Sequence, residues 1–169
     1  DGTKFYVLSD TNNAVYQFSM STAWDLSTSS YDSVSFSVNS QSTTPEALTF
    51  SSDGTKMYVG NGSSTEYVYQ YNLSTAWDLS TASYSSNSLD LTSETVEIQD
   101  LAFSSSGDKL FAAHRGNTVI EVSLSTAWDI STATATGTTF SIASQDADMR
   151  TIAFKSDGTK MYVAGQDTN

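Results

Sequence analysis

The sequence contains no cysteine, which excludes a disulfide framework and every metal site built on thiolates. It also contains a single histidine, His114, so a Ser-His-Asp triad or a zinc site has only one candidate for its essential side chain. No G-x-S-x-G elbow surrounds any serine, and neither glycine-rich phosphate-binding motif occurs. We therefore expect no cofactor, no metal and no catalytic residue that can be recognised from sequence.

Positive charge is scarce as well. Seven Lys and Arg residues stand against nineteen Asp and Glu residues, which gives a net charge of -12. Such a chain repels phosphate backbones and anionic lipid surfaces, so we expect no nucleic-acid partner. The longest apolar runs are far shorter than the ~20 residues that cross a bilayer, so we expect no membrane insertion.

The chain consists of a repeat of about 52 residues. The repeat is clearest in a turn followed by an apolar run, which reads DGTKFYV at 1–7, DGTKMYV at 53–59, SGDKLFA at 106–112 and DGTKMYV at 157–163. An apolar segment ending in Phe precedes three of these turns, at 45–50, 98–103 and 149–154. An apolar strand, a Gly-containing turn and a second apolar strand predict a β-hairpin, whose strands we call A and B.

Two further strands complete each unit. Strand C is expected at 14–18, 67–71 and 118–122, and strand D follows where Val34, Phe36 and Val38 alternate with serines. Four antiparallel strands at this period predict an all-β fold, a β-propeller made of four-stranded blades. The expected units are strands B, C and D of a first blade (1–44), a second blade (45–97), a third blade (98–148) and strands A and B of a fourth (149–169).

These units amount to about three and a quarter blades, whereas propellers usually close with about four to eight. We therefore expect an incomplete ring, which is completed either by further blades or by association of copies, most simply as a two-chain ring of about six blades. The expression product is expected to be oligomeric or prone to aggregation.

An octapeptide containing Trp-Asp recurs as STAWDLST at 21–28 and 74–81 and as STAWDIST at 125–132. The WD-repeat family has a shorter period of ~40 to 45 residues. A segment that is nearly identical in every blade is more typical of scaffold than of chemistry, with one small ligand per blade as the alternative. The predicted structural residues are these pairs and the turn glycines, namely Trp24, Asp25, Trp77, Asp78, Trp128, Asp129, Gly2, Gly54, Gly107 and Gly158.

The A and B strands carry a resemblance to a known family. LTFSSDGTKMYVGN (48–61), IAFKSDGTKMYVAG (152–165) and LAFSSSGDKLFAAH (101–114) resemble the YVTN-type repeats of bacterial and archaeal surface and lactonase-like propellers. The Trp-Asp segment and the Ser/Thr-rich strand D depart from that pattern and are more similar to repetitive propellers of marine bacteria and phages. The resemblance implies a location outside the cell, on the cell surface or on a virion. It also implies that the D–A and B–C loops share one face around the channel mouth.

The units differ from one another where that face is expected. Aligned positions hold Glu46, Gln99 and Arg150, while His114 and Arg115 replace Asn61 and Gly62. This variation predicts a ligand-binding surface that contains Glu46, Gln99, Asp100, His114, Arg115 and Arg150. Asp146 and Asp148 offer oxygen donors for Ca²⁺, but six to eight ligands would have to converge, so solvated acids are the favoured interpretation.

Three hypotheses for the function follow. The favoured one is a noncatalytic recognition or display propeller that binds a glycan or a protein through its variable loops. The alternative is a segment of a lactonase-like or glycan-cleaving propeller enzyme, whose catalytic residues lie on blades outside this sequence. The third is a structural repeat array without a ligand.

Overall fold

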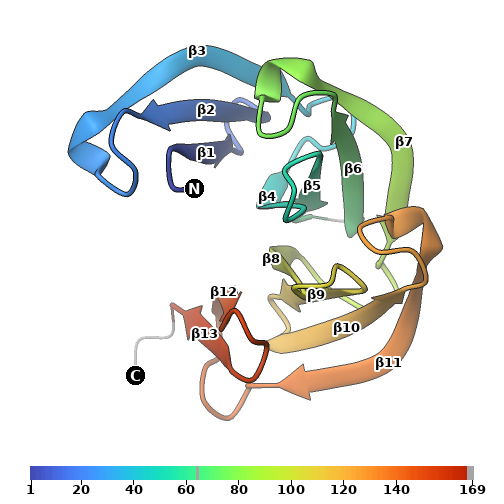
Figure 1. Ribbon diagram of the computed structural model, residues 1–169. Helices are drawn as coiled ribbons and strands as arrows, with labels where there is room; N and C mark the ends of the chain where they lie inside the picture. The colour runs from blue at the N-terminus through green and yellow to red at the C-terminus, as the bar shows by residue number, and fades with distance from the viewer. Residues whose placement is uncertain (64, 167–169) are drawn as a thin grey trace.

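The computed structural model describes residues 1–63 and 65–166 (Figure 1). This part of the chain forms thirteen β-strands and three 3₁₀ helices of three residues each. The prediction of an all-β propeller fold with four-stranded antiparallel blades is confirmed. The expected fourth unit, 149–169, extends to residues 167–169, which lie outside the described residues.

The strands form four antiparallel sheets in which neighbours in sequence pair with one another. The first sheet contains β1 (Lys4–Ser9), β2 (Ala14–Met20) and β3 (Ser29–Ser37). The second contains β4 (Pro45–Phe50), β5 (Lys56–Asn61), β6 (Tyr67–Leu73) and β7 (Ala82–Asp90). The third contains β8 (Ile98–Phe103), β9 (Lys109–His114), β10 (Thr118–Leu124) and β11 (Ala133–Ser141). The fourth contains β12 (Met149–Phe154) and β13 (Met161–Gly165).

The sheets follow one another around an open arc. Figure 1 shows β4, β8 and β12 on the inner side of the arc and β3, β7 and β11 on its outer side. The strands β1 and β13 lie at the two sides of the opening. Contacts between the inner strands β4 and β8, and between β8 and β12, hold neighbouring sheets together.

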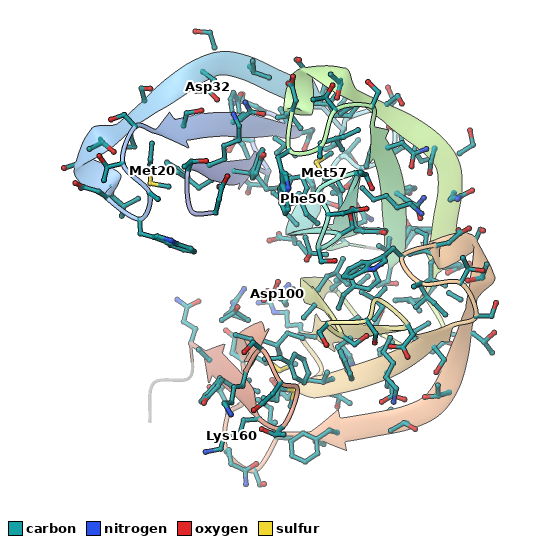
Figure 2. All side chains as sticks on the ribbon, in the orientation of Figure 1. Met20, Asp32, Phe50, Met57, Asp100 and Lys160 are labelled. Atoms are coloured by element: carbon teal, nitrogen blue, oxygen red, sulfur yellow. The ribbon has the colours of Figure 1, made fainter. Side chains whose placement is uncertain are left out.

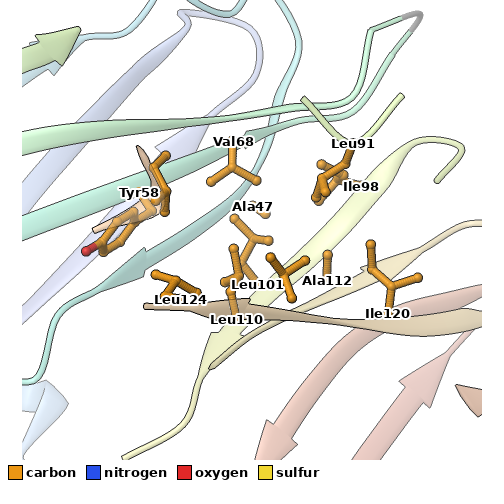
Figure 3. Packing of buried hydrophobic residues seen from close by; sticks show 12 residues of the cluster. Ala47, Tyr58, Val68, Leu91, Ile98, Leu101, Leu110, Ala112, Ile120 and Leu124 are labelled. Carbon is orange, nitrogen blue, oxygen red and sulfur yellow. The ribbon is translucent and has the colours of Figure 1, made fainter. Parts of the chain in front are cut away.

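The core lies between the sheets because alternate residues of each strand point to opposite faces. Between the second and third sheets, Tyr58 and Val68 pack against Leu101, Leu110 and other apolar side chains (Figure 3). A second cluster joins the first two sheets, and a third joins the last two. Fully burying one such side chain contributes roughly 1.5 to 3 kcal/mol, so the repeat is held together by what each sheet buries against the next.

Every strand D contains a bulge that simple alternation does not predict. The pairing of the third and fourth strands of a blade shifts register beside Ser33, Ser86 and Gly137. These residues have φ values of 60°, 66° and 72°. A residue in the left-handed region is a common way to form a bulge, and the bend lets the long outer strand curve around the arc.

Strand register divides the loops between two rims. Pro45 pairs with Asn61 and Tyr67 with Asp90, so connections at these strand ends lie on the same side. We call this side the loop rim, which comprises residues 10–13, 38–44, 62–63, 65–66, 91–97, 115–117 and 142–148. The opposite side is the Trp-Asp rim, which comprises residues 1–3, 21–28, 51–55, 74–81, 104–108, 125–132 and 155–160.

Candidate functional site

On the Trp-Asp rim, each tryptophan lies on the glycine turn of its own sheet. The backbone N–H groups of Trp24, Trp77 and Trp128 donate to the carbonyls of Gly2, Gly54 and Gly107, each at 2.9 Å. A Cβ built on Gly54 would lie 2.2 Å from Cε2 of Trp77. The turn therefore requires glycine at position 54 for two reasons. Its φ of +70° disfavours residues with a side chain, and the indole occupies the space that a side chain would fill.

The aspartate after each tryptophan caps a short helix. Asp78 is typical, because its Oδ1 accepts from the backbone N–H of Ser80 at 3.0 Å and from the Ser80 hydroxyl at 2.6 Å. The tryptophans themselves have φ between 63° and 66°, which costs roughly 1 to 2 kcal/mol for a residue other than glycine. The cap and the indole contact offset that cost, so the pair acts as a unit.

The same segment also joins one sheet to the next. The hydroxyl of Tyr6 donates to the Trp77 carbonyl at 2.6 Å, and the hydroxyl of Tyr58 donates to the Trp128 carbonyl at 2.6 Å. One residue after the aspartate, the Leu79 N–H donates to Gln17 Oε1 at 2.8 Å. Ile130 makes the corresponding bond to Gln70 Oε1 at 3.2 Å. The Trp-Asp segment thus makes its polar contacts to protein at both joints.

The loop rim is different, because charged side chains that vary between the units meet there. The Arg150 guanidinium pairs with Asp148 Oδ2 at 2.8 Å and donates to Gln99 Oε1 at 3.0 Å. Arg115 pairs with Glu97 Oε2 at 2.6 Å, and its Nε lies 3.8 Å from Asp148 Oδ1. Asp148 therefore lies between two guanidinium groups from different sheets.

Glu46 extends this group to the second sheet. Partial loss of solvent raises the pKa of the Glu46 carboxyl, and the nearby Asp10 carboxylate raises it further, while Arg150 opposes the change. The side chain lies over Gly62, where a Cβ would be 2.0 Å from Glu46 Cγ. We call this group the rim cluster, which contains Glu46, Glu97, Gln99, Arg115, Asp148 and Arg150.

Asp100 is half-buried and links two sheets. Figure 2 places it on the inner side of the arc. One carboxylate oxygen, Oδ2, accepts from the Thr151 hydroxyl at 2.6 Å and from the Ile152 N–H at 2.9 Å. The other oxygen, Oδ1, accepts from the Leu101 N–H at 2.8 Å. These bonds occupy the carboxylate, so Asp100 supports the rim cluster by fixing β8 against β12.

His114 is buried rather than displayed on the surface. Its Nδ1 accepts from the N–H of Gly116 at 3.0 Å, which fixes the loop that carries Arg115. Burial lowers the pKa of the imidazole, which keeps it neutral and able to accept this bond. Of the six predicted residues, the structure therefore brings Glu46, Gln99, Arg115 and Arg150 together. Asp100 and His114 instead make hydrogen bonds that hold neighbouring backbone in place.

The sequence does not indicate Glu97 as a member of the cluster, and it predicts Asp148 to be a solvated acid, with a Ca²⁺ donor as the other possibility. Both residues directly precede strand A, in the position that Thr44 occupies in the second sheet. Aligning this position as well would have shown opposite charges placed beside Arg115 and Arg150. Within residues 1–63 and 65–166, no three His, Asp or Glu side chains gather as a metal site.

The cluster presents hydrogen-bond donors and acceptors side by side in a fixed arrangement. Three carboxylates and two guanidinium groups leave it without excess positive charge, which does not favour an anionic ligand. Paired guanidinium and carboxylate groups suit ligands whose groups both donate and accept, such as hydroxyls. In the part of the chain that the structure describes, no helix is long and apolar enough to cross a membrane.

No protein-family model matches the chain, and no curated protein matches it in sequence. Among solved structures, the chain is similar to a Bacteroides fragilis protein with the provisional name 6-phosphogluconolactonase (TM-score 0.60, 15% identity, 84% of this chain and 37% of that one). It is also similar to a protein of unknown function from Desulfotomaculum acetoxidans (TM-score 0.61, 15% identity, 96% of this chain and 45% of that one). A third is a Bacteroides uniformis protein with the same provisional name as the first (TM-score 0.56, 12% identity, 83% of this chain and 38% of that one).

These likenesses concern the fold alone, because the identities are 15% or lower. They agree with the lactonase-like propeller fold that the A and B strands resemble, whereas a specific relationship to YVTN repeats stays a prediction. The chain spans less than half of the length of each of these three structures.

Proposed function

We propose that the protein is a noncatalytic recognition propeller that binds a glycan or a protein through the rim cluster. The observation that carries the proposal is the contrast between the two rims. On the Trp-Asp rim, the same hydrogen bonds recur at both joints and are made to protein. On the loop rim, side chains that differ from unit to unit converge from three sheets and form a charged group beside solvent.

A glycan is the ligand that the cluster suits best. A sugar hydroxyl donates one hydrogen bond and accepts others, and the cluster offers carboxylate oxygens next to guanidinium N–H groups. Glu46 adds a third carboxyl group, whose oxygens can accept hydrogen bonds from such hydroxyls. A location outside the cell or on a virion surface is part of the same proposal and rests on the resemblance of the A and B strands.

The test compares an Arg115→Ala/Arg150→Ala variant with the wild type on glycan and protein arrays. Loss of charge-assisted hydrogen bonds should weaken binding by about tenfold or more. A Lys109→Ala/Lys155→Ala variant is the matched control, because it also removes two positive charges but does so beside the Trp-Asp rim. Equal binding by the wild type and the arginine variant would place the ligand elsewhere.

The alternative is that the chain is a segment of a lactonase-like propeller enzyme. The provisional names of two similar structures favour this candidate, and a carboxyl group with a raised pKa suits proton transfer. The measurement is hydrolysis of 6-phosphogluconolactone by the wild type and by Glu46→Gln. Turnover that the glutamine variant loses would support the enzyme and would place a catalytic residue on these sheets instead of on blades outside this sequence. Binding of a glycan or protein at the rim, lost in the arginine variant, would support recognition.

A further inference from the structure

We propose that His114 and Glu66 form an acid-sensitive latch, in which protonation of the His114 imidazole releases the loop that carries Arg115 and loosens the rim cluster. Both side chains are buried, at 7% and 6% exposure. Glu66 lies just before β6 in the second sheet, His114 ends β9 in the third, and both of these sheets have all four strands. As regulation of the rim cluster the proposal rests on the proposed function, but the latch itself can be measured without a ligand.

The imidazole holds its loop by accepting a hydrogen bond. Nδ1 of His114 accepts from the backbone N–H of Gly116 at 3.0 Å, so the neutral ring carries its proton on Nε2. A Cβ built on Gly116 would lie 2.6 Å from Cε1 of the ring, so the loop backbone lies directly against the imidazole. A second proton on Nδ1 would place two donors face to face. The bond would then break, and the Gly116 N–H would lose its acceptor.

The Glu66 carboxylate holds the loop that faces Arg115. Its Oε1 accepts from the N–H of Glu97 at 3.2 Å. Glu97 has a φ of 54°, in the left-handed region that disfavours residues with a side chain. Arg115 supports this conformation twice, because its N–H donates to the Glu97 carbonyl at 3.1 Å and its guanidinium donates to Glu97 Oε2 at 2.6 Å. Release of the Arg115 loop would therefore remove the support of Glu97 as well.

Burial and charge act on the imidazole in opposite directions. Burial lowers the pKa of His114, and the Glu66 carboxylate opposes this by favouring the charged ring. The other charged side chains of β8 and of the surrounding loops have hydrogen-bond or ion-pair partners of their own, namely Glu94, Glu97, Asp100, Arg115, Asp146 and Asp148. Glu66 is therefore the charge that tunes the latch.

The sign of the pH effect follows from the two states of the loop. In the closed loop the pKa of the buried His114 lies below its ordinary value of about 6.5, which it regains when the loop opens and water reaches the ring. The open loop therefore binds the proton more tightly. Below about pH 6.5 the ratio of open to closed loops rises by up to about tenfold per pH unit, until the pKa of the closed state is reached. Acid should thus open the latch.

Amide hydrogen exchange measured by NMR between about pH 7.5 and 5.5 tests the latch without a ligand, since histidine is the side chain that ordinarily titrates in this range. The protection factor of the Gly116 amide should fall about threefold or more as the pH is lowered. The Val38 amide, which donates to the Asn13 carbonyl at 2.8 Å, is the internal control and should keep its protection factor. A constant Gly116 value, or one that falls in parallel with Val38, would overturn the proposal.

The variant His114→Asn separates the imidazole from other effects of acid. It introduces the residue that the second sheet has at this position, where Asn61 holds its own loop by donating to the carbonyls of Ser63 and Thr65 at 3.1 and 2.7 Å. An amide does not titrate in this range, so the Gly116 protection factor should no longer depend on pH. A dependence that this variant retains would assign the effect to another group and overturn the latch.

The variant Glu66→Gln tests the carboxylate. Glutamine keeps an acceptor for the Glu97 N–H but removes the charge that favours the imidazolium. The fall in Gly116 protection should therefore occur at a lower pH than in the wild type. A fall at the same pH would show that Glu66 has no part in the latch.

Binding at the two pH values then tests the consequence for the rim cluster. The probe is the array glycan or protein that the wild type binds most strongly at about pH 7.5. Wild-type binding should weaken about threefold or more at about pH 5.5, whereas binding by His114→Asn should change less. Equal weakening of both proteins would show that the latch does not regulate the rim cluster. If the array offers no probe, the proposed function fails, while the exchange measurement still decides the latch.

Discussion

The contact between Gly54 and Trp77 gives the most decisive test of how the repeat is built, and the perturbation is Gly54→Ala. An added methyl group would lie 2.2 Å from Cε2 of the indole, which is far inside contact distance. The backbone at Gly54 also has a φ of +70°, where alanine is disfavoured. The substitution therefore adds a backbone cost and forces the indole away from the turn.

The two costs can be separated. Placing alanine in the left-handed region costs roughly 1 to 2 kcal/mol. Complete removal of a buried tryptophan costs roughly 3 to 5 kcal/mol, and displacement of a ring that is already 38% exposed should cost less, about 1 to 2 kcal/mol. The sum for Gly54→Ala is a loss of about 2 to 4 kcal/mol in the free energy of unfolding.

Gly137 supplies the matched control. It has a φ of +72° but nothing lies within 4 Å of the position of its Cβ, so Gly137→Ala carries the backbone cost alone. Urea unfolding followed by tryptophan fluorescence measures both variants. Gly54→Ala should be about 1 to 2 kcal/mol less stable than Gly137→Ala, which corresponds to a difference of about 2 to 8 °C in Tm. Equal losses would refute the idea that the indole needs a bare backbone beneath it.

Two further predictions concern the joints between sheets. Gln17→Ala leaves the buried N–H of Leu79 without its acceptor at 2.8 Å, so it should lower the free energy of unfolding by about 1 to 3 kcal/mol. Urea titrations measure this loss. Asn12→Ala, on an exposed loop, is the control and should change the free energy of unfolding little. Burial, followed by the charges of Asp32 and Asp78, raises the pKa of Tyr6 to about 12. The stability that the neutral Tyr6 hydroxyl supplies is therefore fully present below about pH 10 and is lost as the pH rises through 12. Absorbance at 295 nm in an alkaline titration should show one fewer late-ionising tyrosine in Tyr6→Phe, and an unchanged curve would contradict this.

Much of the fold could be predicted because its information is local and repeated. The segments 45–50, 98–103 and 149–154 are strands with the predicted bounds, since apolar runs beside Gly-containing turns leave little choice of hairpin. The bulges at Ser33 and Ser86 could not be predicted, because serine has no special preference for a φ near 60° and only the curvature of the arc requires it. The positive φ values of the three tryptophans could not be predicted for the same reason.

The candidate site was less accessible from sequence. Alignment of the units indicated Glu46, Gln99 and Arg150, because the difference between the units is itself visible in the sequence. It did not reveal that His114 turns inward to hold Gly116, since an exposed and a buried loop histidine look alike in a sequence. Nor did it pair Arg115 with Glu97, because that contact at 2.6 Å depends on how two loops of one sheet meet.

The unequal covering of the three tryptophans has an optical consequence. Trp24, Trp77 and Trp128 sit in the same local conformation, yet Trp24 is 82% exposed and Trp77 is 38% exposed. Indole emission shifts to shorter wavelength when water is removed from the ring. Trp24 is therefore a solvent-exposed fluorophore, and the other two tryptophans are internal references of the same local geometry. Any molecule that covers the Trp24 indole should shift its emission to shorter wavelength, so binding there can be measured without a label.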